Sequence, residues 1–303
     1  MYDIIGDIHG NAIKLHRLLQ KLGYTQNNDF YAHPNRKVIF VGDLIDRGIA
    51  IRETLAIVKA MVDNGSAYVV MGNHEYNAIC FATKDKNGNY LRPHTQQNEN
   101  QHTETLKEFE NRADEWENYL EWFYELPLFL ELENLRIVHA CWDQKHIEFL
   151  RNKLVDNKLT KDLIFETVEK DTPFFWAIEE TLKGKEIDMP NGLIFYDKSN
   201  HPRKEMRIKW WEEPEQMTYK SWSVIPIDSL PDTPIVDVDF SKYSAYAPAE
   251  KPVFFGHYWM TGQPRIQKEN VCCLDYSAGK GGDLVAYRFD GETVLSDDKL
   301  VWV

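Results

Sequence analysis

Three short motifs place carboxylate, imidazole and amide side chains beside glycines, and two further histidines follow apolar runs. The motifs are Gly-Asp-Ile-His-Gly at residues 6–10, Gly-Asp-Leu-Ile-Asp-Arg-Gly at 42–48 and Gly-Asn-His-Glu at 72–75, and the later histidines are His139 and His257. Carboxylate and imidazole ligands together suit divalent ions of hard to borderline character, and the absence of cysteine from these positions argues against a structural zinc site. Glycine lets the backbone turn sharply and approach an ion closely. The pattern therefore predicts a divalent-metal site.

Each motif follows a short apolar run that is typical of a buried strand. Amphipathic stretches at 15–22 and 55–62 separate the first three runs, so the order β-α-β-α-β predicts a parallel sheet with helical crossovers. Polar loops at the carboxyl ends of such strands form the usual ligand crevice, and we expect the motif side chains to converge there. The early runs are 3–5, 37–41, 67–71 and 136–138, and later runs at 252–256, 271–276 and 284–289 also predict strands.

The remaining segments are interpreted as insertions into one domain. We predict a single α/β (α+β) domain over residues 1–303, with insertions at about 83–126 and 144–248. The first insertion is rich in Gln, Asn and Glu, and aromatic residues follow at helical spacing from Trp116 to Leu126. This spacing favours a helical cap whose aromatic stripe packs in the core rather than stacking on bases.

The three motifs resemble those of the metallophosphoesterase, or calcineurin-like phosphoesterase, superfamily, and specifically its phosphoprotein-phosphatase branch. The resemblance is dense over the first 75 residues and resumes at His139, His257 and the tail. It implies a β-sandwich flanked by helices, with the metal site at the carboxyl ends of the strands. It also implies two metals: the first bound by Asp7, His9 and Asp43, and the second by Asp43, Asn73, His139 and His257, so that Asp43 bridges them.

The same resemblance implies a metal-dependent hydrolase of phosphoester bonds. Two divalent cations can activate a bridging water, clamp phosphate oxygens and stabilise the charge that develops in in-line displacement by the bridging hydroxide. His74 is then the general acid, Asp46 orients it, and Arg47 offers a planar donor fork to the phosphate. We expect manganese, with iron, zinc, nickel or cobalt as alternatives, because oxygen and imidazole ligands accept all of these ions.

The substrate is less constrained than the reaction. Asp46 and Glu75 match the protein-phosphatase pattern, whereas the tail at 274–282 resembles that of bacterial diadenosine tetraphosphatases, and Trp259 replaces the second histidine of the common Gly-His-x-His motif. We therefore expect hydrolysis of phosphomonoesters, as by serine/threonine phosphatases. The alternatives are symmetrical hydrolysis of diadenosine tetraphosphate, trimming of nucleic-acid ends, and a catalytically silent phosphate-binding module, whose mark would be lost ligands; none is lost.

A second phosphate-binding arginine is expected between the two late histidines. The segment 202–211 is basic and aromatic, and within it we favour Arg207 over Arg203. The alternative interpretation is an amphipathic strand whose basic side chains lie in solvent.

The composition limits the choice of partners. With 48 acidic and 35 basic residues the formal net charge is −13, which argues against extended binding of nucleic acid or anionic lipid. Any phosphorylated substrate, whether a phosphoprotein, a nucleotide or a small phosphoester, must be held by local charge. The sequence has neither a signal-peptide pattern nor a long apolar stretch, so we expect a cytoplasmic protein without membrane contact.

Overall fold

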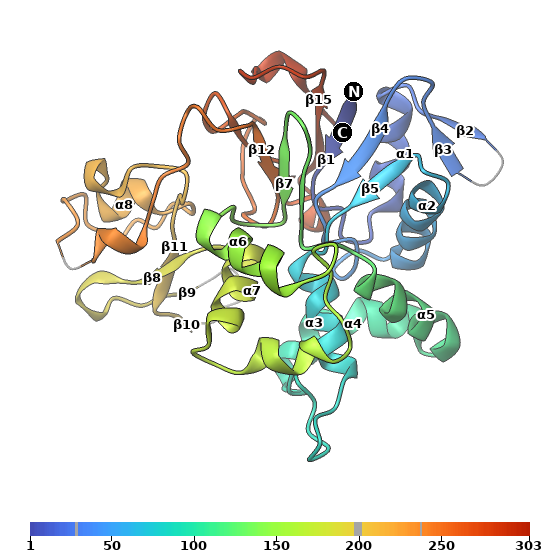
Figure 1. The fold of residues 1–303 in the computed structure, drawn as a ribbon, viewed down its shortest axis with the longest axis horizontal. Coiled ribbons are helices and arrows are strands. Elements are labelled where there is room, and N and C mark those ends of the chain that lie inside the picture. Colours follow the sequence, from blue (N-terminus) through green and yellow to red (C-terminus); the bar gives the residue numbers. More distant parts are fainter. Residues whose placement is uncertain (28–29, 197–201, 237) are drawn as a thin grey trace. The chain divides into compact units, whose positions relative to one another are not determined.

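The computed structural model describes residues 1–303 except 28–29, 197–201 and 237 (Figure 1). The chain forms two compact units. The first comprises Met1–Leu182 and Lys251–Val303, and the second is Lys183–Glu250. Residues 144–182 of the predicted second insertion thus belong to the first unit. Each unit is described by itself.

A mixed sheet in the first unit carries the three motifs. Strand β1 (Tyr2–Ile5) runs parallel to β4 (Lys37–Phe40), and β4 runs parallel to β5 (Ala67–Val69), so the carboxyl ends of all three lie at one edge. The order is β14-β15-β1-β4-β5, in which β15 (Asp283–Phe289) is antiparallel to β1, β14 (Asp275–Tyr276) and β16 (Leu300–Trp302).

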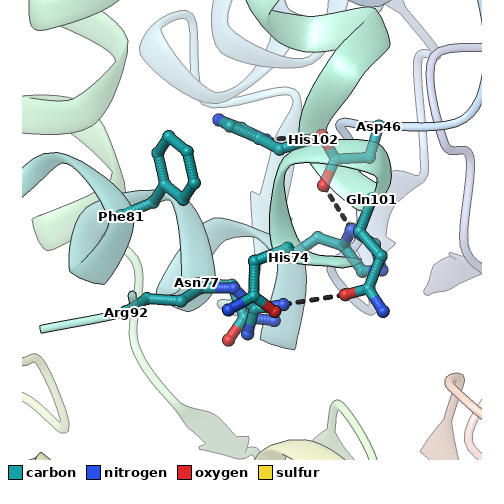
Figure 2. Close-up of a pocket in the computed structure, with 8 residues that line it drawn as sticks. Asp46, His74, Asn77, Phe81, Arg92, Gln101 and His102 are labelled. Carbon is teal, nitrogen blue, oxygen red and sulfur yellow. Dashed lines mark hydrogen bonds and ion pairs between the residues drawn. The ribbon is translucent and has the colours of Figure 1, made fainter. Parts of the chain in front are cut away.

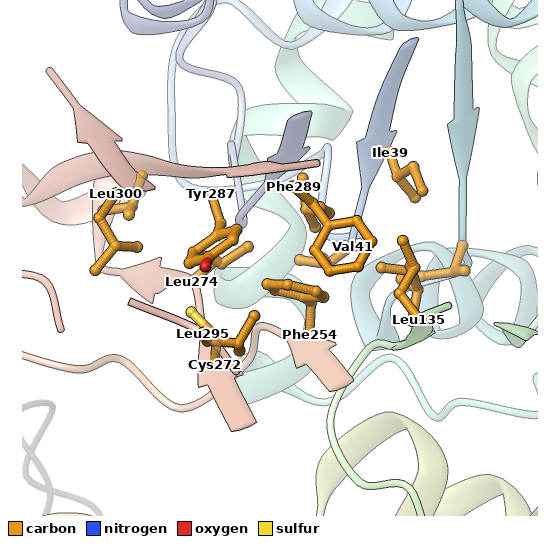
Figure 3. Packing of buried hydrophobic residues seen from close by; sticks show 14 of the residues in the cluster. Ile39, Val41, Leu135, Phe254, Cys272, Leu274, Tyr287, Phe289, Leu295 and Leu300 are labelled. Atoms are coloured by element: carbon orange, nitrogen blue, oxygen red, sulfur yellow. The ribbon is translucent and has the colours of Figure 1, made fainter. Parts of the chain in front are cut away.

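A second sheet of the first unit supplies the late histidines. Its order is β13-β12-β7-β6, with β12 parallel to both β7 and β13. Apolar side chains from the two sheets bury one another: Ile4 and Ile39 of the first sheet belong to the same cluster as Ile137 and Phe254 of the second (Figure 3). This core makes the predicted sandwich. The strands are β6 (Phe129–Glu131), β7 (Arg136–Val138), β12 (Val253–Phe255) and β13 (Val271–Cys273).

Helices of the first unit connect the parallel strands. Helix α1 (Ala12–Lys21) begins at Asn11, whose side chain accepts a hydrogen bond from the backbone of Lys14. Helix α2 (Ile51–Asp63) leads into β5, and α3 (Asn73–Ala82) begins inside the third motif. A hairpin of β2 (Thr25–Asn27) and β3 (Phe30–Ala32) follows α1.

The first predicted insertion is helical, as expected. It holds α4 (Gln96–Phe109) and α5 (Ala113–Tyr124), and α4 contacts both α2 and α5 (Figure 1). The aromatic stripe packs on itself: the ring centroids of Phe109 and Trp116 lie 4.8 Å apart, and those of Trp116 and Phe123 lie 5.9 Å apart. Further along are α6 (Gln144–Lys153), a 3-10 turn at Leu163–Val168 and α7 (Pro173–Lys183).

The second unit has its own small core. Strands β8 (Glu186–Asp188) and β11 (Glu205–Arg207) pair antiparallel, and so do β9 (Phe195–Tyr196) and β10 (Pro202–Arg203). Met206 and Ile208 are buried with Trp222 of α8 (Tyr219–Trp222). In either unit, the helices that the structure describes are too short or too polar to cross a bilayer.

Candidate metal centre and active site

The predicted ligands come together at the carboxyl ends of the strands. Asp43 follows β4, His139 follows β7 and His257 lies just beyond β12. One ligand atom from each of these three lies within 4.8 Å of the others, and the same holds for the set His9, Asp43 and His74. Asp43 belongs to both sets, which is the position that a bridging ligand requires.

Contacts among the ligands fix how they face one another. The amide oxygen of Asn73 lies 3.0 Å from His139 Nε2 and 2.8 Å from His257 Nδ1. His9 Nδ1 donates to the carbonyl of Ile45 at 2.9 Å, and this leaves Nε2 as the ligand atom. Burial lowers the pKa of His9 to about 3, so its ring is neutral, as metal binding requires.

The donor set fits divalent cations. Asp7 Oδ1 and His9 Nε2 are buried, yet neither makes a hydrogen bond within the described part of the chain. Burial raises the pKa of Asp7, and the nearby charges of Asp275 and Asp43 raise it further. Buried carboxylates crowded in this way are costly unless a cation compensates them. The orphaned atoms and the excess negative charge both indicate metal ligands.

Glu75 holds the loop of the second motif. Its Oε2 accepts hydrogen bonds from the backbone of Asp43 and Gly72, both at 2.9 Å, and its Oε1 accepts one from Leu44 at 2.8 Å. A Cβ at Gly72 would lie 2.3 Å from the nitrogen of Asp43, so this approach requires glycine. Burial and the charge of Asp43 raise the pKa of Glu75 to about 7. This role of Glu75 is not predicted from the sequence.

The predicted acid and its partner are in direct contact. His74 Nδ1 lies 2.5 Å from Asp46 Oδ2, and Arg47 Nη2 lies 3.4 Å from His74 Nε2. Burial by itself would raise the pKa of Asp46, but contacts with two histidines, His102 and His74, hold that pKa below its usual range. His74 Nε2 therefore faces Arg47 and Asp43, a predicted metal ligand. Its Nδ1 is held by Asp46 (Figure 2).

Three residues that contact this part of the site are not predicted from the sequence. His102 and Thr105 of α4 hydrogen-bond Asp46, and no motif marks either of them. Asp275 accepts hydrogen bonds from the backbone of Trp259 at 2.8 Å and of Ser277 at 2.9 Å. For Asp275, the Leu-Asp pair at 274–275 is the sequence feature from which a role could have been predicted.

Arg203 and Arg207 lie in the second unit. Arg207 Nε donates to Glu186 Oε1 at 3.0 Å, across the β8–β11 pair, and Arg203 is exposed on β10. Because each unit is described by itself, the role of these arginines in phosphate binding remains a prediction.

A comparison with protein families defines the class. Residues 2–257 match the model of the calcineurin-like phosphoesterase family, so the chain belongs to that family. It is a metallophosphoesterase, a hydrolase that acts on phosphoester bonds, and its family depends on a dinuclear metal centre. The predicted fold class and family resemblance are thereby confirmed.

Individual relatives give a finer picture. The chain is 27% identical to the symmetrical bis(5'-nucleosyl)-tetraphosphatase of Marinomonas sp. (strain MWYL1), over 97% of this chain and 95% of that protein. It is 33% identical over 144 residues to an asymmetrical bis(5'-nucleosyl)-tetraphosphatase of Oceanobacillus iheyensis, covering 46% of this chain and 54% of that one. Among solved structures, a putative diadenosine tetraphosphatase covers 100% of this chain and 92% of its own, at 17% identity and a TM-score of 0.47.

Proposed function

We propose that this protein hydrolyses dinucleoside tetraphosphates symmetrically. The observation that carries the proposal is the end-to-end match to the Marinomonas protein, which spans both insertions as well as the motifs. The sequence alone favours hydrolysis of phosphomonoesters, as by serine/threonine phosphatases, and offers this activity as an alternative. The relatives favour hydrolysis of dinucleoside tetraphosphates, because the names they carry are those of tetraphosphatases.

The site residues can be assigned to steps of such a reaction. Asp7, His9 and Asp43 would hold one divalent ion, and Asp43, Asn73, His139 and His257 the other. When bound, the ions supply an activated water and polarise the phosphate. His74 Nε2 is the atom that can protonate the leaving oxygen, because Asp46 occupies Nδ1. Arg47 contributes donors for phosphate oxygens beside it.

A second cation beside Arg47 favours a substrate with several linked phosphates. The guanidinium carbon of Arg47 lies 4.1 Å from the centroid of the Trp259 ring, and Lys280 Nζ lies 4.0 Å from the same centroid. The two cationic groups are therefore at most about 8 Å apart. One phosphate does not need both, whereas a tetraphosphate can contact both along its length. In a protein of net charge −13, this local pair supports binding of a polyanion.

The turn that bears Lys280 packs directly on the site. A Cβ at Gly279 would lie 2.6 Å from the Cβ of His9 and 3.2 Å from the Cδ of Arg47, so the backbone of this turn touches a predicted ligand and the predicted phosphate-binding arginine. The backbone nitrogen of Trp259 donates a hydrogen bond to the Asp275 carboxylate, and this contact fixes the position of Trp259. Lys280, Trp259 and Arg47 thus form one wall of the site.

The proposal is tested by product analysis. Metal-loaded protein is incubated with diadenosine tetraphosphate, a phosphopeptide and nitrophenyl phosphate, with the His74→Asn variant as the control for contaminating activity. We expect the highest kcat/KM for the tetraphosphate, with ADP as the nucleotide product. Formation of AMP with ATP would make the cleavage asymmetrical. Turnover of the phosphopeptide without cleavage of the tetraphosphate would overturn the proposal and restore the phosphatase reading.

A further inference from the structure

One face of α4 is bound to the catalytic loop. His102, Thr105 and Glu108 are spaced three residues apart, and this spacing places them on one side of the helix. All three make side-chain hydrogen bonds to residues between Asp46 and Arg52, the loop that joins the second motif to α2. This helix lies in the insertion that the family motifs do not cover.

His102 and Thr105 converge on one oxygen of Asp46. His102 Nδ1 donates to Asp46 Oδ1 at 2.7 Å, and the Thr105 hydroxyl donates to the same oxygen at 2.5 Å. The hydroxyl of Thr105 in turn accepts from the backbone nitrogen of Asp46 at 3.1 Å. The other oxygen, Oδ2, is the one that holds His74 (Figure 2). Both carboxylate oxygens are therefore engaged, and the carboxylate has no freedom to rotate away from His74.

Glu108 fixes the far end of the loop. Its Oε1 accepts from the backbone of Ile51 at 2.8 Å and its Oε2 from Arg52 at 2.9 Å, at the first turn of α2. The residue at the helix start, Ala50, offers no side-chain cap, so α4 supplies one from a separate element. The negative charge of the Glu108 carboxylate also lies near the N-terminus of α2, where it interacts favourably with the helix dipole.

The loop between these two anchors is strained. Asp46 and Arg47 have φ values of 68° and 70°, in the left-handed region that non-glycine residues seldom adopt. Such conformations persist when surrounding contacts over-determine them, and they concentrate at functional sites. The contacts of α4 at both ends of the loop are of this kind.

We propose that His102, assisted by Thr105, is a positioning residue of the phosphoesterase reaction: it fixes the Asp46 carboxylate so that His74 presents Nε2 to the leaving oxygen. The inference rests on the acid role given to His74 under the proposed function, but it does not depend on which phosphoester is the substrate. His102 acts through Asp46 and touches no reacting atom.

The test removes the hydrogen bond from position 102 to Asp46 but keeps an aromatic ring at that position. The ring of His102 packs at 5.3 Å from Phe81 and 5.7 Å from Trp116, and phenylalanine can retain both contacts but cannot donate to Asp46. His102→Asn places an amide donor near the position of Nδ1 and serves as the conservative rescue. The matched control is His94→Phe, since His94 also stacks on Phe81, at 3.7 Å, from an exposed position in the same insertion.

Each variant is assayed on aryl phosphates whose leaving groups range from poor to good, with metal content and thermal melting measured in parallel. We expect His102→Phe to lower kcat about tenfold for poor leaving groups, the loss for one hydrogen bond to a charged group, with little change in KM. The loss should shrink for dinitrophenyl phosphate, which needs less protonation. His102→Asn should recover most of the rate, and His94→Phe should behave as wild type.

Three results would overturn the inference: an equal loss for all leaving groups, no loss, or an asparagine variant no better than phenylalanine. If His102→Phe does not fold, Thr105→Val, which removes only the hydroxyl, must show the same dependence on the leaving group. His74→Asn, measured beside these variants, separates the two claims. If that variant shows no leaving-group dependence, the acid role itself is wrong; if it does and the His102 and Thr105 variants do not, only the positioning role is wrong.

Discussion

Gly256 packs against the side chain of Asp7, a predicted metal ligand, and its replacement by alanine is a sharp test of the site. The residue follows β12 and precedes His257, another predicted ligand. A Cβ at this position would lie 1.8 Å from Asp7 Oδ1, 2.8 Å from the Cγ of Asp7 and 2.9 Å from the Cγ2 of Val41. The added methyl would therefore occupy the space of a carboxylate oxygen.

The displacement that this substitution demands can be worked from these distances. Non-bonded heavy atoms settle at about 3.5 Å, so the oxygen must withdraw by more than about 1 Å. Distances between a metal ion and its ligand atoms deviate from their usual values by only about 0.2 Å. Asp7 has little room to adjust, since its Oδ2 already accepts a hydrogen bond from the backbone of His257 at 2.9 Å. We expect Gly256→Ala to lose the ion that Asp7 is proposed to bind and to lower kcat/KM by about 10- to 100-fold.

The assay is elemental analysis after gel filtration, followed by hydrolysis of nitrophenyl phosphate. The control is Gly65→Ala, because a Cβ there meets no atom within 4 Å and its φ of +69° adds only about 1 kcal/mol of backbone strain. This control should keep its metal and its activity. A Gly256→Ala protein with the wild-type metal content and turnover would refute the placement of Asp7 in the site.

Exhaustive chelation should abolish activity and re-addition of a divalent ion should restore it, whereas full activity in metal-free protein would contradict the dinuclear mechanism. His74→Asn should leave the metal content intact and slow turnover by about 10² to 10⁴, with a smaller penalty for nitrophenyl phosphate; equal penalties would argue against an acid role. Lys280→Met should lower kcat/KM for diadenosine tetraphosphate about tenfold relative to kcat/KM for nitrophenyl phosphate. An unchanged ratio would show that Lys280 does not bind the polyphosphate. Hydrogen bonds from Arg36 and Lys299 lower the pKa of Asp290 to about 2, so its contribution to stability is present above about pH 4 and is lost as the pH falls through 2. Because this carboxylate is exposed, Asp290→Asn should cost at most about 1 kcal/mol at pH 7 in urea unfolding, and a deficit that persists at the lowest pH would show that the contact is not electrostatic.

The elements that carry the predicted ligands could be predicted because each motif interrupts a strongly apolar run. The runs at 3–5 and 136–138 became β1 and β7 with bounds within one residue of those expected, and His139, which follows the second run, lies in a cluster of side chains that could hold a metal ion. The reason is physical: a buried parallel strand needs a continuous apolar stretch, and the polar residue that ends it must lie at the sheet edge.

The partners of these motifs could not be predicted in the same way. Helical spacing places His102 and Thr105 on one face of α4, but it does not say which surface that face will meet. Their contact with Asp46 joins positions 56 and 59 residues apart, and tertiary packing alone decides it. The same holds for Lys280, whose contact with Trp259 depends on how the tail folds back over the site.

Charge links the parts of this site to one another. Asp7 and Asp275 are buried, and the pKa of each is raised by burial and by the charge of Asp43, which means that their ionised forms destabilise one another in the absence of cations. Divalent ions held by these residues would relieve that repulsion, so the free energy of metal binding would also stabilise the fold around the predicted ligands. With the carboxylates compensated, we expect Arg47 and Lys280 to attract an incoming anion with little repulsion from the carboxylates beside them. On the proposed function, a protein with a large net negative charge would in this way attract a polyphosphate, because the ions and these two side chains, rather than the net charge of the protein, would set the local charge at the site.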